Sequence, residues 1–256
     1  MGNTLGAIGL LLLGSLIGSV LNCCIDRWPR HNSPFHTEQA TARQWIPFIL
    51  IWALIKWNAE GSSIPKRYFV TEILTGIVAV LTYQWIPSLA IPYFVLFCIL
   101  WVATCTDLET WIISDACTLT GIALGVMLSA CYPSLHWTSD RMASVIFSLQ
   151  GMCWGTGGLF LMASFIEWFM RKDAMGLGDV KLIGCIGAFL GWEGCVWSLF
   201  VGSLLGTLFV CLRTLYPKNN QRQLLILKHA IPFGPHLAAA ALLFIPYQHF
   251  VLMGLS

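Results

Sequence analysis

Charged residues are scarce in this sequence, making up 10% of its 256 residues, whereas soluble globular proteins carry about 25%. Hydrophobic residues make up 57%, and the mean hydropathy is +0.74. These values exclude an ordinary soluble domain and indicate an integral protein that crosses the lipid bilayer several times. The net charge of only +2 gives no reason to expect a nucleic-acid partner.

Several motifs are also missing. No Lys or Arg precedes Arg27, so the apolar run from Met1 to Ile25 lacks the basic start of a secretory signal peptide, and we expect a retained first span. No two of the ten cysteines form a C-x-x-C pair, and most lie in or beside apolar runs, which predicts small core side chains rather than metal ligands or disulfides. Neither H-E-x-x-H nor a G-x-S-x-G elbow with a histidine partner is present.

Seven further apolar segments follow the first and predict an all-α, polytopic membrane protein with about eight transmembrane helices. They cover residues 69–85, 89–106, 112–131, 142–170, 174–192, 195–216 and 231–253. Basic residues collect in cytoplasmic loops, and all fourteen except Arg141 fall in or beside alternate connections. The pattern predicts eight spans with both termini outside. We expect residues 1–68 to form the first helix and an N-terminal cytoplasmic loop region, and residues 69–256 to form the membrane core.

Asp179 is the residue that most needs an explanation, because it places a carboxylate in the segment Ala174–Trp192. The apolar part, Leu182–Trp192, makes roughly 16 Å of helix, which is too short to cross a bilayer alone. We therefore expect the helix to start upstream, near Asp173, with Asp179 about 9 Å along its axis. An ionisable side chain there is a functional candidate.

A second acidic stretch contains Asp107 and Asp115, which a continuous helix would place about 80° apart around its axis. The predicted topology puts Asp107 and Asp179 at cytoplasmic ends of different spans. Two carboxylates brought close share a proton, so that one polarises a carbonyl group while the other activates water. These residues alone leave three interpretations open: a paired-aspartate protease, a proton-coupled transporter with a paired-aspartate ion site, and a structural polar contact.

Five ordered segments together resemble the prepilin peptidase family, which are polytopic aspartyl proteases of the GxGD type. Met175-Gly-Leu-Gly-Asp-Val-Lys181 is similar to the family's second aspartate motif, and Asp107 with Asp115 is similar to its first. The other three are Gly18-Ser-Val-Leu-Asn22 with Asp26-Arg-Trp-Pro29, Arg67-Tyr-Phe-Val-Thr-Glu-Ile-Leu-Thr-Gly76, and Ile231-Pro-Phe-Gly-Pro235. The resemblance covers nearly the whole chain.

The resemblance implies that Asp107 and Asp179 are the catalytic pair of a protease in the bacterial inner membrane with its active site facing the cytoplasm. Its substrates would be prepilins or pseudopilins, cleaved after a glycine where the basic leader meets the hydrophobic helix. Supporting or substrate-binding roles are expected for Asp115, Gly176, Gly178, Lys181 and Glu72. The two glycines either admit the substrate backbone or pack helices closely. Lys181 either holds Asp179 ionised or marks the cytoplasmic interface, and we favour the interface. Glu72 is expected to make a buried polar contact.

Two departures from the family pattern bear on function. Ser114 stands where relatives usually have proline, which predicts a less rigid turn before Asp115. The first cytoplasmic loop lacks the two C-x-x-C pairs of many relatives, so we expect no zinc site, and we read His31, His36 and Glu38 as solvated surface. Bifunctional relatives also methylate the new N-terminus with S-adenosylmethionine, and the missing cysteines leave that activity open here. The apolar run Trp45–Trp57 is too short to cross and suggests an interfacial helix or a lid.

Overall fold

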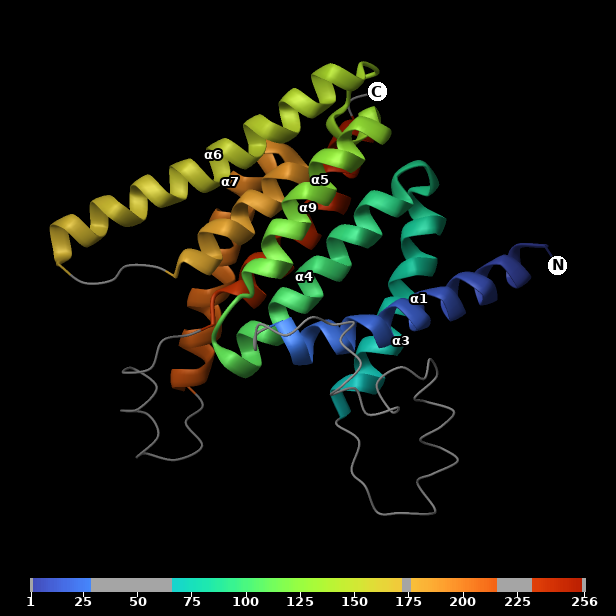
Figure 1. Cartoon of the computed structure of the whole chain (residues 1–256), viewed down its shortest axis with the longest axis horizontal. Helices are drawn as coiled ribbons and strands as arrows, with labels where there is room; N and C mark the ends of the chain where they lie inside the picture. The colour runs from blue at the N-terminus through green and yellow to red at the C-terminus, as the bar shows by residue number, and fades with distance from the viewer. Residues whose placement is uncertain (1, 29–65, 172–175, 216–231, 255–256) are drawn as a thin grey trace, which may run out of the picture. The chain divides into compact units, whose positions relative to one another are not determined.

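The computed structural model describes residues 2–28, 66–171, 176–215 and 232–254. Within these ranges the protein is all-helical, with seven α-helices, two short 3₁₀ turns and no strand (Figure 1). The α-helices are α1 (Gly2–Arg27), α3 (Lys66–Trp85), α4 (Ala90–Thr110), α5 (Asp115–Cys131), α6 (Arg141–Met170), α7 (Leu177–Leu215) and α9 (Gly234–Gly254). Each of the eight apolar segments expected from the sequence contains a helix.

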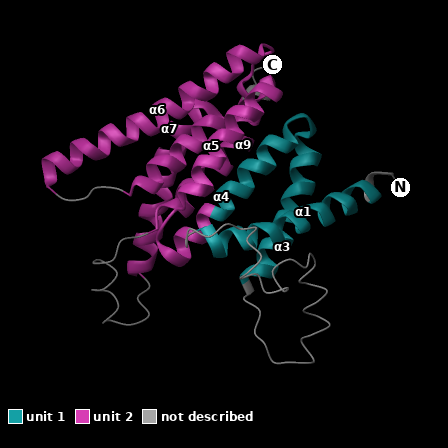
Figure 2. Cartoon of the chain, in the orientation of Figure 1, with its two compact units in different colours: residues 1–102 teal, residues 103–256 magenta. Residues whose placement is uncertain are grey.

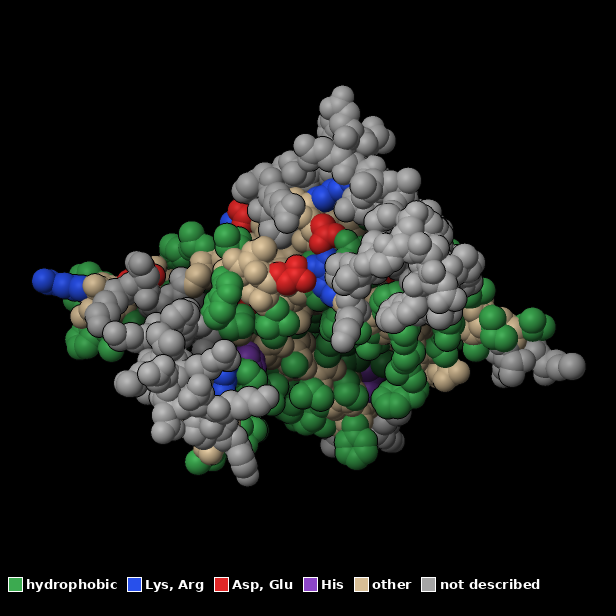
Figure 3. Space-filling model, turned by 90° about the horizontal axis from the view of Figure 1, so that it is seen from below, with side chains coloured by type: hydrophobic (Ala, Val, Ile, Leu, Met, Phe, Trp, Pro, Cys, Tyr) green, Lys and Arg blue, Asp and Glu red, His purple; other side chains and the backbone are tan. Residues whose placement is uncertain are grey.

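Within the described ranges, four helical segments are long and apolar enough to cross a bilayer: Leu5–Arg27, Pro87–Thr110, Arg141–Met170 and Leu177–Leu215. Large hydrophobic side chains lie exposed on all of them, and hydrophobic side chains cover much of the described surface in Figure 3, where acidic and basic ones are few. Such a surface suits lipid rather than water. The fold is therefore that of a helical membrane protein.

The chain forms two compact units, residues 1–102 (unit 1) and 103–256 (unit 2), coloured separately in Figure 2. In unit 1, α1 packs antiparallel against α3 through glycines that leave no room for a side chain. A Cβ atom added to Gly14 would lie 2.7 Å from the carbonyl oxygen of Thr75, and one added to Gly18 would lie 2.9 Å from Cα of Glu72. Small residues at such crossings allow helix backbones to approach closely in a membrane.

In unit 2, α7 is two helical arms rather than one rod. Gly191 has φ 71° and ψ −174°, which interrupts the helix between residues 177–190 and 192–215. Sγ of Cys195 lies 3.4 Å from the carbonyl oxygen of Ile183, although a straight helix would separate residues twelve apart by about 18 Å. The second arm therefore folds back along the first. This break lies where the sequence separates two apolar segments.

The first arm of α7 is the centre of unit 2, and nine consecutive residues, 182–190, are buried. Helix α6 runs antiparallel to this arm, with Gly151 against Gly187, whereas α5 runs parallel to it, with Gly125 against Ala188. Helix α9 runs antiparallel to the second arm. Near the start of α9, the ring of His236 contacts Phe209, and near its end the ring of Tyr247 stacks on Trp197. Leu177, where the first arm begins, and Leu215, where the second arm ends, thus lie at the same end of unit 2.

All ten cysteines are free thiols, and seven of them are buried. The prediction that most are small core side chains is confirmed. Cys195 illustrates the role: its thiol donates weakly to backbone carbonyl oxygens of Gly151 and Ile183, at the point where α6 meets the two arms of α7.

Candidate active site

Asp107 lies in the last turn of α4 and is 6% exposed. Its Oδ2 accepts a hydrogen bond of 2.9 Å from the backbone N–H of Gly234, the first residue of α9. The C-terminal end of a helix is electrostatically unfavourable for a carboxylate, whereas the free N–H groups at the start of another helix are favourable. The start of α9 therefore stabilises a carboxylate that the end of α4 disfavours.

Asp179 lies in the first turn of α7 and is half-buried. The expected helix start near Asp173 is wrong, because Gly176 is not helical and α7 begins at Leu177. The backbone N–H of Asp179 donates to the carbonyl oxygen of Gly176 at 3.1 Å. Within the described ranges its carboxylate accepts no hydrogen bond, so it is open to water or to a ligand.

Both aspartates belong to unit 2, and their carboxyl groups lie close enough for their charges to interact. They come from different helices, as expected. Asp179 lies in the first turn of α7, and Asp107, in the last turn of α4, accepts a hydrogen bond from the start of α9. Two carboxylates whose charges interact favour a state in which they share one proton. This arrangement suits acid–base chemistry on a peptide bond.

Asp115 and Lys181 form an ion pair of 2.6 Å between Nζ and Oδ1. Lys181 thus contacts neither of the two central carboxylates through an ion pair in the described chain, and it joins the first turn of α7 to the first residue of α5. The continuous helix considered for Asp107 and Asp115 is not formed, because α4 ends at Thr110 and Trp111 has φ 60°. Asp115 therefore links α5 to α7 through an ion pair.

The two motif glycines have different surroundings. Gly176 is exposed, and a Cβ atom there would lie 3.6 Å from Oδ2 of Asp179, in ordinary contact. A Cβ atom on Gly178 would lie 3.0 Å from Cβ of Ile113, which is tighter than almost all real contacts. In this structure Gly178 therefore serves close packing, while Gly176 leaves open space beside the carboxylate.

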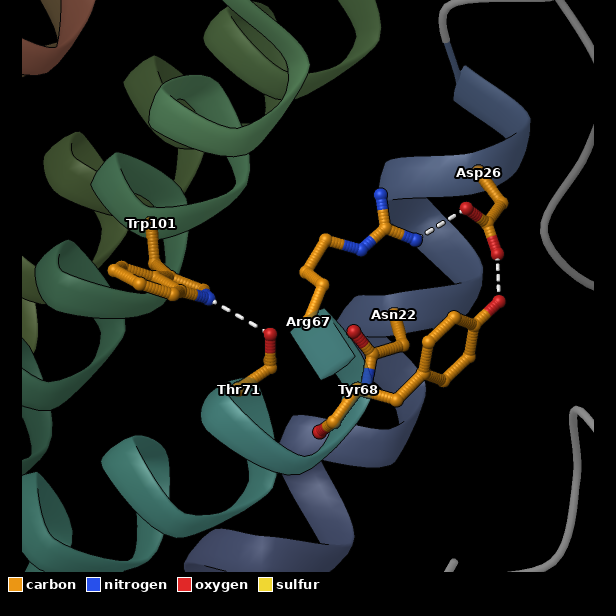
Figure 4. A network of polar contacts seen from close by, with 6 residues as sticks. All are labelled: Asn22, Asp26, Arg67, Tyr68, Thr71 and Trp101. Carbon is orange, nitrogen blue, oxygen red and sulfur yellow. Dashed lines mark hydrogen bonds and ion pairs between the residues drawn. The ribbon is translucent and has the colours of Figure 1, made fainter. Parts of the chain in front are cut away.

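Glu72 belongs to unit 1 and is 2% exposed, as expected for a buried polar contact. Near it lies a polar network that the sequence did not predict (Figure 4). Asp26, at the end of α1, accepts hydrogen bonds from Arg67 and Tyr68 at the start of α3. In the same view Trp101 donates to Thr71 at 3.1 Å. Asp26 and Arg67 both occur in motifs quoted above, and their opposite charges were the available signal.

Sequence reasoning also missed the hydrogen bond from Gly234 to Asp107 and the contact of Ile113 with Gly178. The signal for Gly234 was the pattern Pro-Phe-Gly-Pro, because proline in the first turn of a helix marks a helix start, where backbone N–H groups are free. No group of three metal-ligating side chains occurs in the part of the chain that the structure describes. His31, His36, Glu38 and Trp45–Trp57 lie outside the described residues.

The fold and this site define a class: a helical membrane protein with two interacting carboxylates at helix ends. Residues 94–211 match the type IV leader peptidase family. This matched stretch contains Asp107, Asp115 and Asp179, so it includes both aspartate motifs quoted above.

Relatives from several bacteria carry the name prepilin leader peptidase/N-methyltransferase. The protein of Myxococcus xanthus is 27% identical over 214 residues, covering 78% of this chain and 61% of that protein. The protein of Aeromonas salmonicida strain A449 is 29% identical, with 86% and 68% covered, and that of Escherichia coli K12 is 25% identical, with 93% and 96% covered. The match thus spans less than two thirds of the Myxococcus protein. No solved structure matches the chain.

Proposed function

We propose that this protein is a GxGD-type aspartyl endopeptidase that removes the leader of prepilins or pseudopilins after a glycine at the cytoplasmic face of the bacterial inner membrane. One observation carries the proposal: within unit 2, Ile113 lies against both Gly178, which precedes Asp179, and Gly234, which holds Asp107, so the two aspartates lie at the same end of the unit. The names of the relatives support the same substrate class.

The chemistry follows from how the pair is held. Oδ2 of Asp107 is engaged by Gly234, while its Oδ1 accepts no hydrogen bond from a described residue. One carboxyl group, protonated, donates to the scissile carbonyl oxygen, and the other, ionised, removes a proton from the attacking water. The resulting tetrahedral intermediate collapses with proton transfer to the leaving amine. The pair titrates as one unit, so neither residue is assigned a fixed role.

We propose eight membrane-crossing segments, with α7 supplying two of them, and both termini outside. Residues 69–256 then form the protease core, and residues 1–68 the first span and cytoplasmic loop region. A transporter would need its acidic pair on a path that opens alternately to both sides. The placement of Asp107, Asp179 and the start of α9 at a single end of unit 2 supports the protease instead.

The substrate fits this geometry by its own amphipathic character. A prepilin carries a basic leader, which stays in the cytoplasm, followed by a hydrophobic helix that enters the membrane. The scissile bond then lies at the boundary, next to Asp179 in the first turn of α7. Exposed Gly176 leaves room for an extended peptide backbone to reach Asp179.

The relatives' names include N-methylation, and we propose S-adenosylmethionine as a second substrate without a zinc-stapled loop. The amino group of S-adenosylmethionine needs hydrogen-bond acceptors. In unit 1, Oγ of Ser19 and Oδ1 of Asn22 are buried and have no hydrogen-bond partner among the described residues, so they fit this need and would hold that group. The bound compound supplies the methyl group.

The test is mass spectrometry of a prepilin incubated with membranes that contain the protein and S-adenosylmethionine. The expected product is the prepilin without its leader, absent with Asp107→Asn and with Asp179→Asn. A further mass increase of one methyl group would show methylation. Cleavage that persists in either Asn variant, or no cleavage of several prepilins by the wild type, would overturn the proposal.

A further inference from the structure

Ile113 lies between the two parts of the chain that hold the aspartates. It belongs to the short connection between α4 and α5, residues 111–114, and it is 6% exposed. Neither its sequence position nor its apolar side chain marks it as functional. Its contacts, however, reach both sides of the dyad.

One end of the Ile113 side chain meets the residue before Asp179. A Cβ atom added to Gly178 would have Cβ, Cγ1 and the carbonyl oxygen of Ile113 as its three nearest atoms, at 3.0, 3.6 and 3.6 Å. The first turn of α7 therefore rests directly on Ile113. Any sideways shift of this residue moves the backbone that carries Asp179.

The other end meets the residue that holds Asp107. A Cβ atom added to Gly234 would lie 3.2 Å from Cδ1 of Ile113 and 2.7 Å from Oδ2 of Asp107. Because the N–H of Gly234 donates to that same Oδ2, the position of α9's start sets the position of the carboxylate. Ile113 limits how closely this start can approach α7.

The connection itself is fixed at several points. The N–H of Trp111 donates to the carbonyl oxygen of Asp107 at 3.0 Å, and the hydroxyl of Thr110 donates to the carbonyl oxygen of Ile112 at 3.3 Å. On the other side, Asp115 is tied to Lys181. Ile113 is thus held from both directions, as a spacer must be.

We propose that Ile113 is a positioning residue that sets the separation of Asp107 and Asp179 by filling the space between Gly178 and Gly234. The inference rests on the proposed function. Two carboxylates share a proton and act together only at a suitable separation, and a misplacement of about 1 Å costs on the order of 100-fold in rate. Ile113 touches neither reacting carboxylate with a polar group, so its effect is geometric.

The test begins with Ile113→Ala, which shortens the spacer, and Leu135→Ala as a control. Leu135 is 2% exposed and lies in the 3₁₀ turn Pro133–His136, at the opposite end of unit 2. Both changes create a cavity and lower thermal stability. We expect kcat for prepilin cleavage to fall about 10- to 100-fold in Ile113→Ala with KM within about twofold, and to stay within about twofold in Leu135→Ala.

A double-mutant cycle with Gly178→Ala provides the second readout. The added Cβ atom presses on Ile113, and a shortened side chain at 113 lets the connection move into the vacated space. We expect the double variant to have a kcat about tenfold or more above the product of the two single effects. Paired with Leu135→Ala, Gly178→Ala should instead give independent effects.

Failure of this inference differs from failure of the proposed function. If Asp107→Asn and Asp179→Asn abolish cleavage but Ile113→Ala keeps the wild-type kcat, or if positions 113 and 178 act independently, Ile113 is only a core residue. If either Asn variant still cleaves, the proposed function itself is wrong.

Discussion

Lys181 forms its ion pair with Asp115, 2.6 Å away, and not with Asp179, two residues before it in the sequence. The pair joins the first turns of α7 and α5, and its side chains are 34% and 60% exposed. Lys181 therefore links α7 to α5 and forms no ion pair with Asp179 among the described residues.

This assignment predicts a small effect of removing the lysine. Exposed ion pairs contribute about 0 to 1 kcal/mol, so Lys181→Met should lower the melting temperature only slightly and reduce prepilin cleavage less than about tenfold. The double variant with Lys181→Asp and Asp115→Lys should restore the melting temperature and the cleavage activity that Lys181→Met loses. A loss as large as that of Asp179→Asn in a cleavage assay would show that Lys181 acts on the dyad directly.

Gly234 tolerates no side chain if Asp107 is to keep its place. The Cβ atom of Gly234→Ala would lie 2.7 Å from Oδ2 of Asp107, so the carboxylate must move. We expect kcat to fall on the order of 100-fold. Gly206→Ala is the matched control, because its nearest atoms lie 3.8 Å away or more and alanine is a better helix former. Equal kcat values for the two variants would contradict this role of Gly234.

Ser114 offers a stabilising substitution. It precedes α5 with φ −65°, the value that proline prefers, and its side chain makes no capping hydrogen bond. Ser114→Pro should therefore stabilise the protein by about 0.4 to 1 kcal/mol, with cleavage retained, because it restricts the unfolded chain. Ser114→Ala should be nearly neutral. Thermal unfolding in detergent measures both, and a lower melting temperature for the proline variant would refute the argument.

His136 predicts a loss of stability in acid. Burial lowers the pKa of this imidazole to about 4, against the opposing effect of the Ala188 carbonyl group. The folded protein then favours the neutral form. Its stability contribution is complete above pH about 6.5 and is lost as the pH falls from there towards 4, by up to about 1.4 kcal/mol per pH unit.

Melting temperatures at pH 7.5, 6, 5 and 4 would check this loss. His136→Asn retains a side-chain N–H near Nδ1 but does not titrate, so its melting temperature should fall less over the same range. Identical pH dependence in the two proteins would assign the loss to other groups.

Helix positions were largely predictable from the sequence, and tertiary partners were not. Apolar runs of membrane length report where helices lie, and the polar interruption after Trp192 marked the break in α7. The start of that helix was placed too early because Gly176 is not helical, which hydrophobicity does not reveal. The pairing of Lys181 with Asp115, like the contacts of Ile113, depends on how α5 and α7 pack, and a single sequence carries no record of that.

The reversal of α7 at Gly191 has a consequence for the bilayer. The first arm, residues 177–190, is about 21 Å long, which is less than the usual hydrocarbon thickness of about 30 Å. The last carbonyl groups of a helix lack helical partners and need other hydrogen-bond donors. The hydroxyl of Ser148 donates to the carbonyl oxygen of Ala188 at 2.7 Å and is one such donor. The two proposed crossings of α7 therefore require that the membrane around Gly191 thins or admits water from the outer side.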